Sequence, residues 1–328
     1  MIMRNNILII GSGAFGVALS QPLIDNENNV YFYTKKQETI DGLMNGQHRS
    51  VPNIKLEKPT KCFSDLKEAF QQNINYLILA IPSAGLPDLY NEIKPFLNEN
   101  ITIVNTSKGL SDQEEGVWSK LFLKDNIVKK YSLIVGPSFA DELVKKNKTI
   151  INVVSNNREV AKSVQNIFNN NYFKLVYFSD EYLASLASSF KNSLALALGL
   201  LNHYSDSINT QSAYLTIGLN EVQTILNRLT NSCEVKILDF FGVGDIFLTC
   251  TSDMSRNYRF GKQIGQFGFK EAQKINQNMT IEGVRTLKFI KQYIDEYNLE
   301  LPLFNCLYQI CYENKNPNTF LDYVWEAI

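Results

Sequence analysis

In the stretch Ile7-Leu8-Ile9-Ile10-Gly11-Ser12-Gly13-Ala14-Phe15-Gly16, four apolar residues pass directly into a turn with Gly-x-Gly-x-x-Gly spacing. Glycines at this spacing permit a tight turn and a close approach of the backbone, and the amides at the start of the following helix bind a pyrophosphate. A lone match also occurs in chance turns, but this one lies between a strand and a helix. The stretch predicts a dinucleotide site in which these residues contact the cofactor: Gly11, Ser12, Gly13, Ala14, Phe15 and Gly16.

The first half of the chain alternates short apolar runs with amphipathic segments, which is the βαβ pattern of a parallel sheet covered by helices. The runs expected to form strands are residues 7–10, 30–33, 76–81, 101–105, 133–135 and 150–154. Several of them are apolar throughout, as strands buried on both faces are. We expect an α/β fold with a Rossmann-type, doubly wound parallel sheet.

The pattern changes after residue 178, where Ser179 and Asp180 can cap a long helix with apolar residues at helical spacing. Further helices are expected over 215–229, 260–275, 283–297 and 302–312, with loops at 242–244 and 314–318. The sequence therefore predicts a dinucleotide-binding Rossmann domain over 1–180 and an all-α domain over 181–328.

The composition is that of a globular protein, with 45% hydrophobic and 20% charged residues. Its 32 basic and 33 acidic residues give a net charge of −1, which argues against a nucleic-acid coat or a membrane-surface protein. The first apolar run is too short for a signal peptide, and we expect no membrane span and a cytoplasmic location. Two histidines and five scattered cysteines predict no metal site. The cysteines are Cys62, Cys233, Cys250, Cys306 and Cys311.

The end of the second expected strand bears on the choice of coenzyme. A carboxylate there binds the ribose 2′-hydroxyl of NAD, whereas cationic residues suit the 2′-phosphate of NADP. This place holds Thr34-Lys35-Lys36, and no acid occurs until Glu38. Lys35 and Lys36 therefore favour NADPH, or use of both NADPH and NADH, although paired lysines also occur on ordinary solvated surfaces.

Lys191 is expected at the edge of the apolar stripe of the long helix, beside small residues that leave room for another group. Desolvation lowers the pKa of a lysine and fits it for proton transfer. The alternative is an edge lysine that extends its amine to water.

A second group of polar residues follows the glycines at 242 and 244. Asp245 is expected on a loop, where it can orient a lysine, and Ser255-Arg256-Asn257 is expected at a helix start. A guanidinium, short polar side chains and free backbone amides together suit a phosphate. An ordinary loop followed by a capping serine would give the same residues.

Taken together, the motifs resemble the NAD(P)-dependent glycerol-3-phosphate dehydrogenases, the bacterial type more than the eukaryotic one. The resemblance covers nearly the whole chain, with the motifs in family order. Besides the glycine turn they are Ser107-Lys108-Gly109-Leu110, Gly136-Pro137-Ser138-Phe139-Ala140, Lys191-Asn192, Gly244-Asp245 with Leu248-Thr249-Cys250, Ser255-Arg256-Asn257 and Ile281-Glu282-Gly283. The resemblance implies an NAD(P)-binding Rossmann domain over 1–180 and a helical substrate-binding domain over 181–328. It also implies reversible reduction of dihydroxyacetone phosphate to sn-glycerol 3-phosphate, which supplies glycerophospholipid synthesis.

The resemblance also implies roles for individual residues. Lys191 would transfer the proton, Lys108 would be a second lysine between cofactor and substrate, and Asp245 and Thr249 would support them. The substrate would contact Lys108, Gly136, Ser138, Lys191, Asn192, Asp245, Thr249, Ser255, Arg256 and Asn257. Beyond the glycine turn and the two lysines at 35 and 36, the cofactor would contact Lys108, Ala140, Arg256 and Glu282.

Three departures from the family pattern occur: Phe15 in place of tryptophan or tyrosine, Ser107 in place of threonine, and no arginine before Gly218. The last puts the assembly in doubt, so the sequence leaves a homodimer open. Two other functions compete: a related dehydrogenase acting on another hydroxy acid or sugar acid, and a dinucleotide-binding sensor without catalysis.

Overall fold

The structure is a computed structural model that describes residues 4–109, 116–230, 237–277 and 279–328. The chain divides into two compact units, Met1–Ser185 and Leu186–Ile328. Each unit is described by itself.

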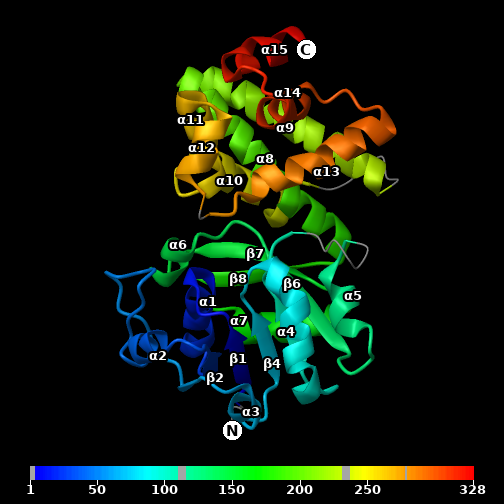
Figure 1. The fold of residues 1–328 in the computed structure, drawn as a ribbon. Helices are drawn as coiled ribbons and strands as arrows, with labels where there is room; N and C mark the ends of the chain where they lie inside the picture. Colours follow the sequence, from blue (N-terminus) through cyan, green and yellow to red (C-terminus); the bar gives the residue numbers. More distant parts are fainter. Residues whose placement is uncertain (1–3, 110–115, 231–236, 278) are drawn as a thin grey trace. The chain divides into compact units, whose positions relative to one another are not determined.

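The first unit is built on an eight-stranded sheet with the strand order β3-β2-β1-β4-β5-β6-β7-β8 (Figure 1). The strands are β1 (Asn6–Ile10), β2 (Asn29–Tyr33), β3 (Lys61–Phe63), β4 (Tyr76–Leu79), β5 (Thr102–Asn105), β6 (Lys130–Val135), β7 (Thr149–Val154) and β8 (Phe173–Phe178). The order reverses between β1 and β4, as in a doubly wound fold. The Rossmann-type fold class predicted from the sequence is confirmed.

The sheet differs from the prediction in two respects. β7 runs antiparallel to β6, so the sheet is mostly and not wholly parallel. Two strands were also missing from the predicted set: β3, which has only three residues, and β8, in which buried residues alternate with more exposed ones at its start. A strand that pairs along three residues, as β3 does with β2, has too short a pattern to be recognised by periodicity.

Seven helices of the first unit connect the described strands. They are α1 (Ala14–Asp25), α2 (Gln37–Met44), α3 (Leu66–Phe70), α4 (Leu86–Ile93), α5 (Trp118–Leu123), α6 (Ala140–Val144) and α7 (Arg158–Phe168), with 3-10 turns η1 (Ser83–Gly85) and η2 (Lys94–Phe96).

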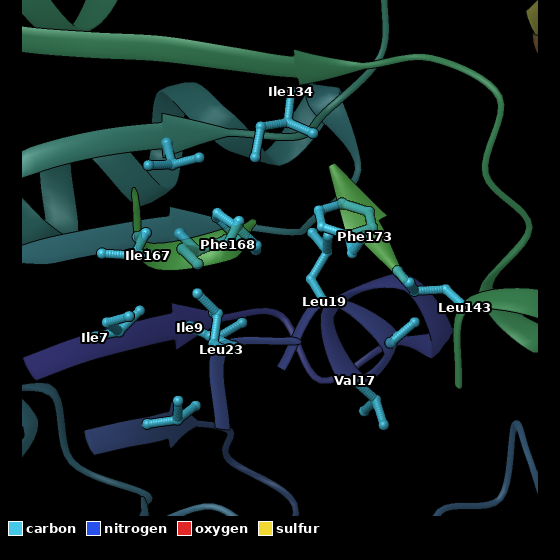
Figure 2. Packing of buried hydrophobic residues seen from close by; sticks show 14 of the residues in the cluster. Ile7, Ile9, Val17, Leu19, Leu23, Ile134, Leu143, Ile167, Phe168 and Phe173 are labelled. Atoms are coloured by element: carbon cyan, nitrogen blue, oxygen red, sulfur yellow. The ribbon is translucent and has the colours of Figure 1, made fainter. Parts of the chain in front are cut away.

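One buried cluster joins strands and helices of this unit (Figure 2). Ile7 and Ile9 of β1 have no exposed surface, and Leu19 and Leu23 of α1 pack in the same cluster, which also contains Phe173 of β8. Burial of such side chains stabilises the fold by about 1.5–3 kcal/mol each. Because this packing fixes β1 against α1, it also fixes the glycine turn between them.

The second unit is helical. α8 (Glu181–Tyr204) enters it from the first unit and is followed by α9 (Ile208–Leu229), α10 (Asp245–Cys250), α11 (Arg256–Phe267), α12 (Phe269–Ile275), α13 (Glu282–Tyr297), α14 (Pro302–Tyr312), the 3-10 turn η4 (Pro317–Thr319) and α15 (Phe320–Glu326). The predicted all-α second half is confirmed. The segment expected as one helix over 260–275 is two helices, because Gly268 has φ +78° and breaks the path of the chain.

The glycines near 242 were predicted to lie in a loop, and this is wrong. Residues Phe240–Gly244 form the π-helical turn η3, in which Gly242 has non-helical angles (φ −90°, ψ −109°), and the turn passes directly into α10. A side chain on Gly242 would place its Cβ 2.1 Å from the carbonyl oxygen of Ile237. The close approach of two backbone segments therefore explains the glycine.

α8 is the one described helix with the length and apolar composition of a membrane span. All of its most apolar window is buried inside the protein. It is the core helix of the second unit, where residues 186–201 are all buried.

Candidate active site

The glycine turn between β1 and α1 has a backbone path that side chains would block. Gly11 has φ +117°, and a Cβ there would lie 2.2 Å from the carbonyl oxygen of Ala80. A Cβ on Gly16 would lie 2.0 Å from the carbonyl oxygen of Gly11, whereas one on Gly13 would meet no atom within 4 Å. Gly11 and Gly16 are therefore required by the turn itself, and Gly13 leaves open space in front of the helix.

The N-terminus of α1 is suited to an anion. Gly13 is its N-cap, no described side chain caps it, and the first turn contains no acidic residue. The first amides of a helix lack partners within the helix and carry the positive end of its dipole. Because the cradle is open and its donors have no capping side chain, the residues present fit the pyrophosphate of a dinucleotide.

The end of β2 lies next to this turn. The Ser12 hydroxyl donates a hydrogen bond to Thr34 Oγ1 at 3.1 Å, and Thr34 is buried. Lys35 and Lys36 are exposed, with Lys35 Nζ 3.9 Å from a carboxylate oxygen of Glu92. Both lysines thus stand at the position from which the coenzyme ribose is recognised in this fold.

A residue that the sequence analysis did not select, His48, contacts the same turn. His48 is buried, hydrogen-bonds the backbone of Ser12 and accepts a hydrogen bond at Nδ1 from the amide of Ser50 at 3.2 Å. Burial is the largest influence and lowers the pKa of His48, so the imidazole is neutral at pH 7. No periodic signal marks His48, because it lies in an irregular segment between α2 and β3.

Three more turns lie at the same edge of the sheet. β1, β4, β5 and β6 are parallel neighbours, so the residues that follow them meet at one edge. Lys108 follows β5 and is half-buried, while Gly136 and Ser138 follow β6 and Ala140 begins α6. Gly136 has φ +148°, and a Cβ there would lie 2.8 Å from Ile151 Cβ. The fold therefore gathers the predicted residues of the first unit at the carboxyl ends of its strands.

In the second unit, Lys191 of α8 forms a hydrogen-bonded ion pair with Asp245, the first residue of α10. Each side chain is only 1% exposed. The Thr249 hydroxyl donates to the Asp245 carbonyl oxygen at 2.6 Å and also lies 3.4 Å from its carboxylate. The alternative in which Lys191 extends to water is wrong, because Asp245 compensates its buried charge. The expectation that Asp245 lies on a loop is also wrong, since the π-helical turn holds it at a helix start.

The residues after Lys191 join α8 to α11 and α13. Asn192 donates to Glu282 at 2.9 Å and accepts from Asn257 at 3.1 Å, and Asn257 in turn accepts from the Gly283 amide at 2.9 Å. A Cβ on Gly283 would lie 2.4 Å from the Asn192 carbonyl oxygen. Asn192, Asn257 and Glu282, predicted as separate contacts, therefore form one network.

Ser255 and Arg256 begin α11. The Ser255 side chain caps the helix by accepting from the Tyr258 amide at 3.3 Å, as predicted for the start of a helix. Arg256 is exposed, whereas Asn257 beside it is buried. Ser255 is thus used as a cap, and the guanidinium of Arg256 is the group of this motif presented to solvent.

Two cavities occur in the part of the chain that the structure describes. One of about 600 Å³ is in the first unit and is lined in part by Lys120 and Glu181, and one of about 340 Å³ is in the second unit beside Arg285 and Tyr312. Neither is lined by a predicted site residue. The candidate site is therefore identified by its charged and polar residues and their contacts, and not by the volume of a cavity.

The described cysteines are free and buried: Cys62, Cys250, Cys306 and Cys311. Cys233 and Leu110 lie outside the described residues. Burial raises the pKa of the Cys250 thiol, so the group next to the Lys191 backbone is neutral. In the part of the chain that the structure describes, no three His, Cys, Asp or Glu side chains form a group that could hold a metal ion.

Comparisons with known proteins give one consistent result. Residues 6–161 match the family model described as NAD-dependent glycerol-3-phosphate dehydrogenase N-terminus, and residues 180–322 match the corresponding C-terminus model. The chain is 32% identical to glycerol-3-phosphate dehydrogenase (NAD(P)+) of Mesoplasma florum, covering 99% of this chain and 98% of that relative. It is 33% identical to the enzyme of the same name from Mycoplasma mobile, covering 99% and 97%. A crystal structure of glycerol-3-phosphate dehydrogenase from Coxiella burnetii has a TM-score of 0.84 and 25% identity, covering 98% of this chain and 99% of that one.

Proposed function

The chain belongs to the NAD-dependent glycerol-3-phosphate dehydrogenase family, and we propose that it reduces dihydroxyacetone phosphate reversibly to sn-glycerol 3-phosphate with NADH or NADPH. The observation that carries this proposal is the buried pair of Lys191 and Asp245. A buried ion pair gives little net stability compared with well-packed apolar side chains, so its presence here favours a use for its proton or charge. The proposed substrate has a carbonyl oxygen that gains a proton on reduction.

When bound, the coenzyme supplies the hydride to the carbonyl carbon of the ketone. Lys191 gives a proton to the carbonyl oxygen in this direction and takes it back from the hydroxyl in the other. Asp245 holds the amine in place, and Thr249 holds Asp245. Lys108 is assigned a second positive charge at the reacting groups, which stabilises the carbonyl oxygen as negative charge develops on it.

The phosphate of the substrate is assigned to Arg256, with Asn192 and Asn257 beside it. The Arg256 guanidinium is exposed and can form two parallel hydrogen bonds to a phosphate. Gly136 and Ser138 are assigned to the substrate from the first unit. The binding free energy of a phosphate remote from the carbonyl contributes to rate by positioning the ketone.

Most coenzyme contacts are assigned to residues 1–180 and most substrate contacts to residues 181–328. Gly11 to Gly16 hold the pyrophosphate, and Ala140, Arg256 and Glu282 complete the coenzyme contacts. Lys35 and Lys36 favour NADPH through the 2′-phosphate. The location is proposed to be the cytoplasm, and the product is proposed to supply glycerophospholipid synthesis.

The test is the absorbance of NADPH and of NADH at equal concentrations, recorded before and after dihydroxyacetone phosphate is added. Oxidation that depends on the ketone, with the larger kcat/KM for NADPH, is expected. Coenzyme binding without turnover would favour a dinucleotide sensor and overturn the proposal. A large preference for NADH would leave the activity standing and reject the role of Lys35 and Lys36.

A further inference from the structure

The three residues before Lys108 are each anchored within the first unit. The Thr106 hydroxyl donates to the Leu79 carbonyl at 2.9 Å, and the Ser107 hydroxyl donates to the Ile81 carbonyl at 2.7 Å. The Ser107 amide donates to the side-chain oxygen of Asn105 at 3.0 Å. The backbone that leads into Lys108 is therefore fixed both by the neighbouring strand end and by a side chain.

Asn105 is itself held by Tyr131 on the adjacent strand β6. Its side-chain nitrogen donates to the Tyr131 hydroxyl at 3.1 Å. The Tyr131 hydroxyl in turn hydrogen-bonds the carboxylate of Glu181, at the start of α8. Donors and acceptors alternate along this chain, because the carboxylate accepts, the hydroxyl donates and accepts, and the amide does both.

Helix α5 connects this series of hydrogen bonds to the residue that follows Lys108. The amide of Ser119 donates to Glu181 at 3.1 Å, and the indole of the preceding Trp118 donates to the Gly109 carbonyl at 2.9 Å. Gly109 has φ +100°, so the turn after Lys108 has a path that favours glycine. Lys108 thus lies between two anchored residues, Ser107 and Gly109, that belong to one closed circuit of hydrogen bonds.

Burying the polar groups of this circuit costs free energy unless each of them has a hydrogen-bond partner. Asn105 has no exposed surface, and Tyr131 and Glu181 are each 6% exposed. Burial raises the pKa of Glu181, and its hydrogen bonds with Ser119 and Tyr131 offset only part of this increase. Apolar side chains could fill the same space without this desolvation cost. Hydrogen-bonded polar side chains, by contrast, hold their partners in one arrangement because hydrogen bonds are directional.

We propose that Asn105, Tyr131 and Glu181 are positioning residues, which act through Ser107 and Gly109 to hold Lys108 in its reactive geometry. The inference rests on the proposed function, in which Lys108 faces the reacting groups. All three side chains are buried, so we assign them no direct contact with the substrate and expect their effect on the rate to pass through Lys108.

The first experiment measures this coupling in a double-mutant cycle. Tyr131→Phe leaves the ring but removes the hydroxyl and its two hydrogen bonds, with Asn105 and with Glu181. We expect kcat with dihydroxyacetone phosphate to fall at least about fivefold. In the Lys108→Ala background the same change is expected to have no further effect on kcat. Equal losses in both backgrounds, or no loss in the wild-type background, would overturn the proposal.

The matched control is Tyr172→Phe. Tyr172 is also a buried tyrosine of the first unit that donates to a carboxylate, Asp25, at 2.6 Å, but it lies outside the circuit. We expect it to leave kcat unchanged in both backgrounds. Glu181→Gln keeps an acceptor for the Tyr131 hydroxyl and is expected to retain most of the activity, whereas Glu181→Leu is expected to behave like Tyr131→Phe.

A second measurement keeps this inference separate from the proposed activity. Amide hydrogen exchange of the wild-type chain and its variants reports directly on residues 105–109. Tyr131→Phe is expected to speed exchange of the Ser107 amide about fivefold, and Tyr172→Phe is expected to leave it unchanged. Unchanged exchange in Tyr131→Phe would refute the positioning role, whether or not the chain turns over dihydroxyacetone phosphate.

Discussion

The ammonium of Lys191 and the carboxylate of Asp245, 54 residues apart in the sequence, form an ion pair in which each side chain is 1% exposed. Removing one partner of a buried pair leaves the other charge uncompensated, at a cost of about 3–5 kcal/mol. Substitutions in this pair are therefore expected to affect both the stability of the second unit and the proton transfer assigned to Lys191.

The first prediction separates these two effects. Lys191→Met is expected to lower kcat by at least about 10²-fold and to reduce the free energy of unfolding, because it leaves Asp245 buried and unpaired. Adding Asp245→Leu is expected to restore much of the stability and none of the activity. Chemical denaturation and coenzyme oxidation assays measure both. Lys274→Met, which breaks an exposed i, i+3 pair with Glu271, is the control. Near-normal turnover of Lys191→Met would reject its role.

The glycine turn gives a second prediction. Gly11→Ala is expected to distort the turn, because the new Cβ would lie 2.2 Å from the Ala80 carbonyl oxygen. Gly13→Ala has room in the protein and is expected to fold normally but to bind coenzyme at least about tenfold more weakly, since it fills the approach to the pyrophosphate. Circular dichroism and coenzyme fluorescence titration measure these effects. Gly85→Ala, with its nearest contact at an ordinary 3.4 Å, is the control. Undiminished coenzyme binding by Gly13→Ala would place the pyrophosphate elsewhere.

The phosphate assignment predicts the behaviour of Arg256. Arg256→Ala is expected to lose about 1.5–3 kcal/mol of binding to the phosphate, which raises KM for dihydroxyacetone phosphate by about 10-fold to 150-fold. Steady-state kinetics measure this change. The control is Arg259→Ala, one turn later on α11, where the guanidinium is bonded to the Asp253 carbonyl. Similar KM increases in the two variants would show that Arg256 has no specific contact with phosphate.

Glu221 of α9 predicts a pH dependence of stability. Its carboxyl oxygens accept hydrogen bonds from the amides of Leu303 and Phe304 at 2.7 and 3.0 Å. Burial nevertheless raises the pKa of Glu221 to about 7. The folded-state pKa lies above the unfolded value, so the contribution of Glu221 to stability is present below about pH 4.5 and is lost as the pH rises through 7. The loss is of the order of 3 kcal/mol.

Urea denaturation at pH 5 and pH 8 tests the direction of this change in stability. Glu221→Gln is expected to reduce the decrease in unfolding free energy between these two pH values, because glutamine does not titrate. Glu296→Gln on the exposed surface of α13 is expected to leave the decrease unchanged. If Glu221→Gln made the decrease larger, the direction of the pKa shift would be wrong.

Local patterns allowed the first half of the fold to be predicted, and backbone contacts that leave no periodic signal in the sequence explain what was missed. The glycine turn and its flanking strand and helix are encoded within ten adjacent residues, so spacing was sufficient. The position of Asp245 depended on the close approach of Gly242 to Ile237, and nothing in the neighbouring sequence indicates that contact. The antiparallel direction of β7 likewise depends on pairing with β6.

The residues of the site divide in the same way. Lys108, Lys191 and Arg256 were identified by motif, but the partners that fix them were not. Asn105 gave one available signal, as a polar residue that ends an otherwise apolar strand run. Tyr131 and Glu181 gave none, because a tyrosine in a strand and an acid at a helix start are both common. Only the folded chain brings these side chains together.

The most direct test of the account compares two substrates that differ only in the phosphate. Purified wild-type chain is mixed with NADPH and either dihydroxyacetone phosphate or dihydroxyacetone, with Lys191→Met run in parallel. We predict oxidation of NADPH by the wild type with the phosphorylated ketone, a kcat/KM at least about 10²-fold lower with the unphosphorylated one, and almost none by Lys191→Met. Equal rates with both ketones, or no oxidation of NADPH or NADH with dihydroxyacetone phosphate, would contradict the account.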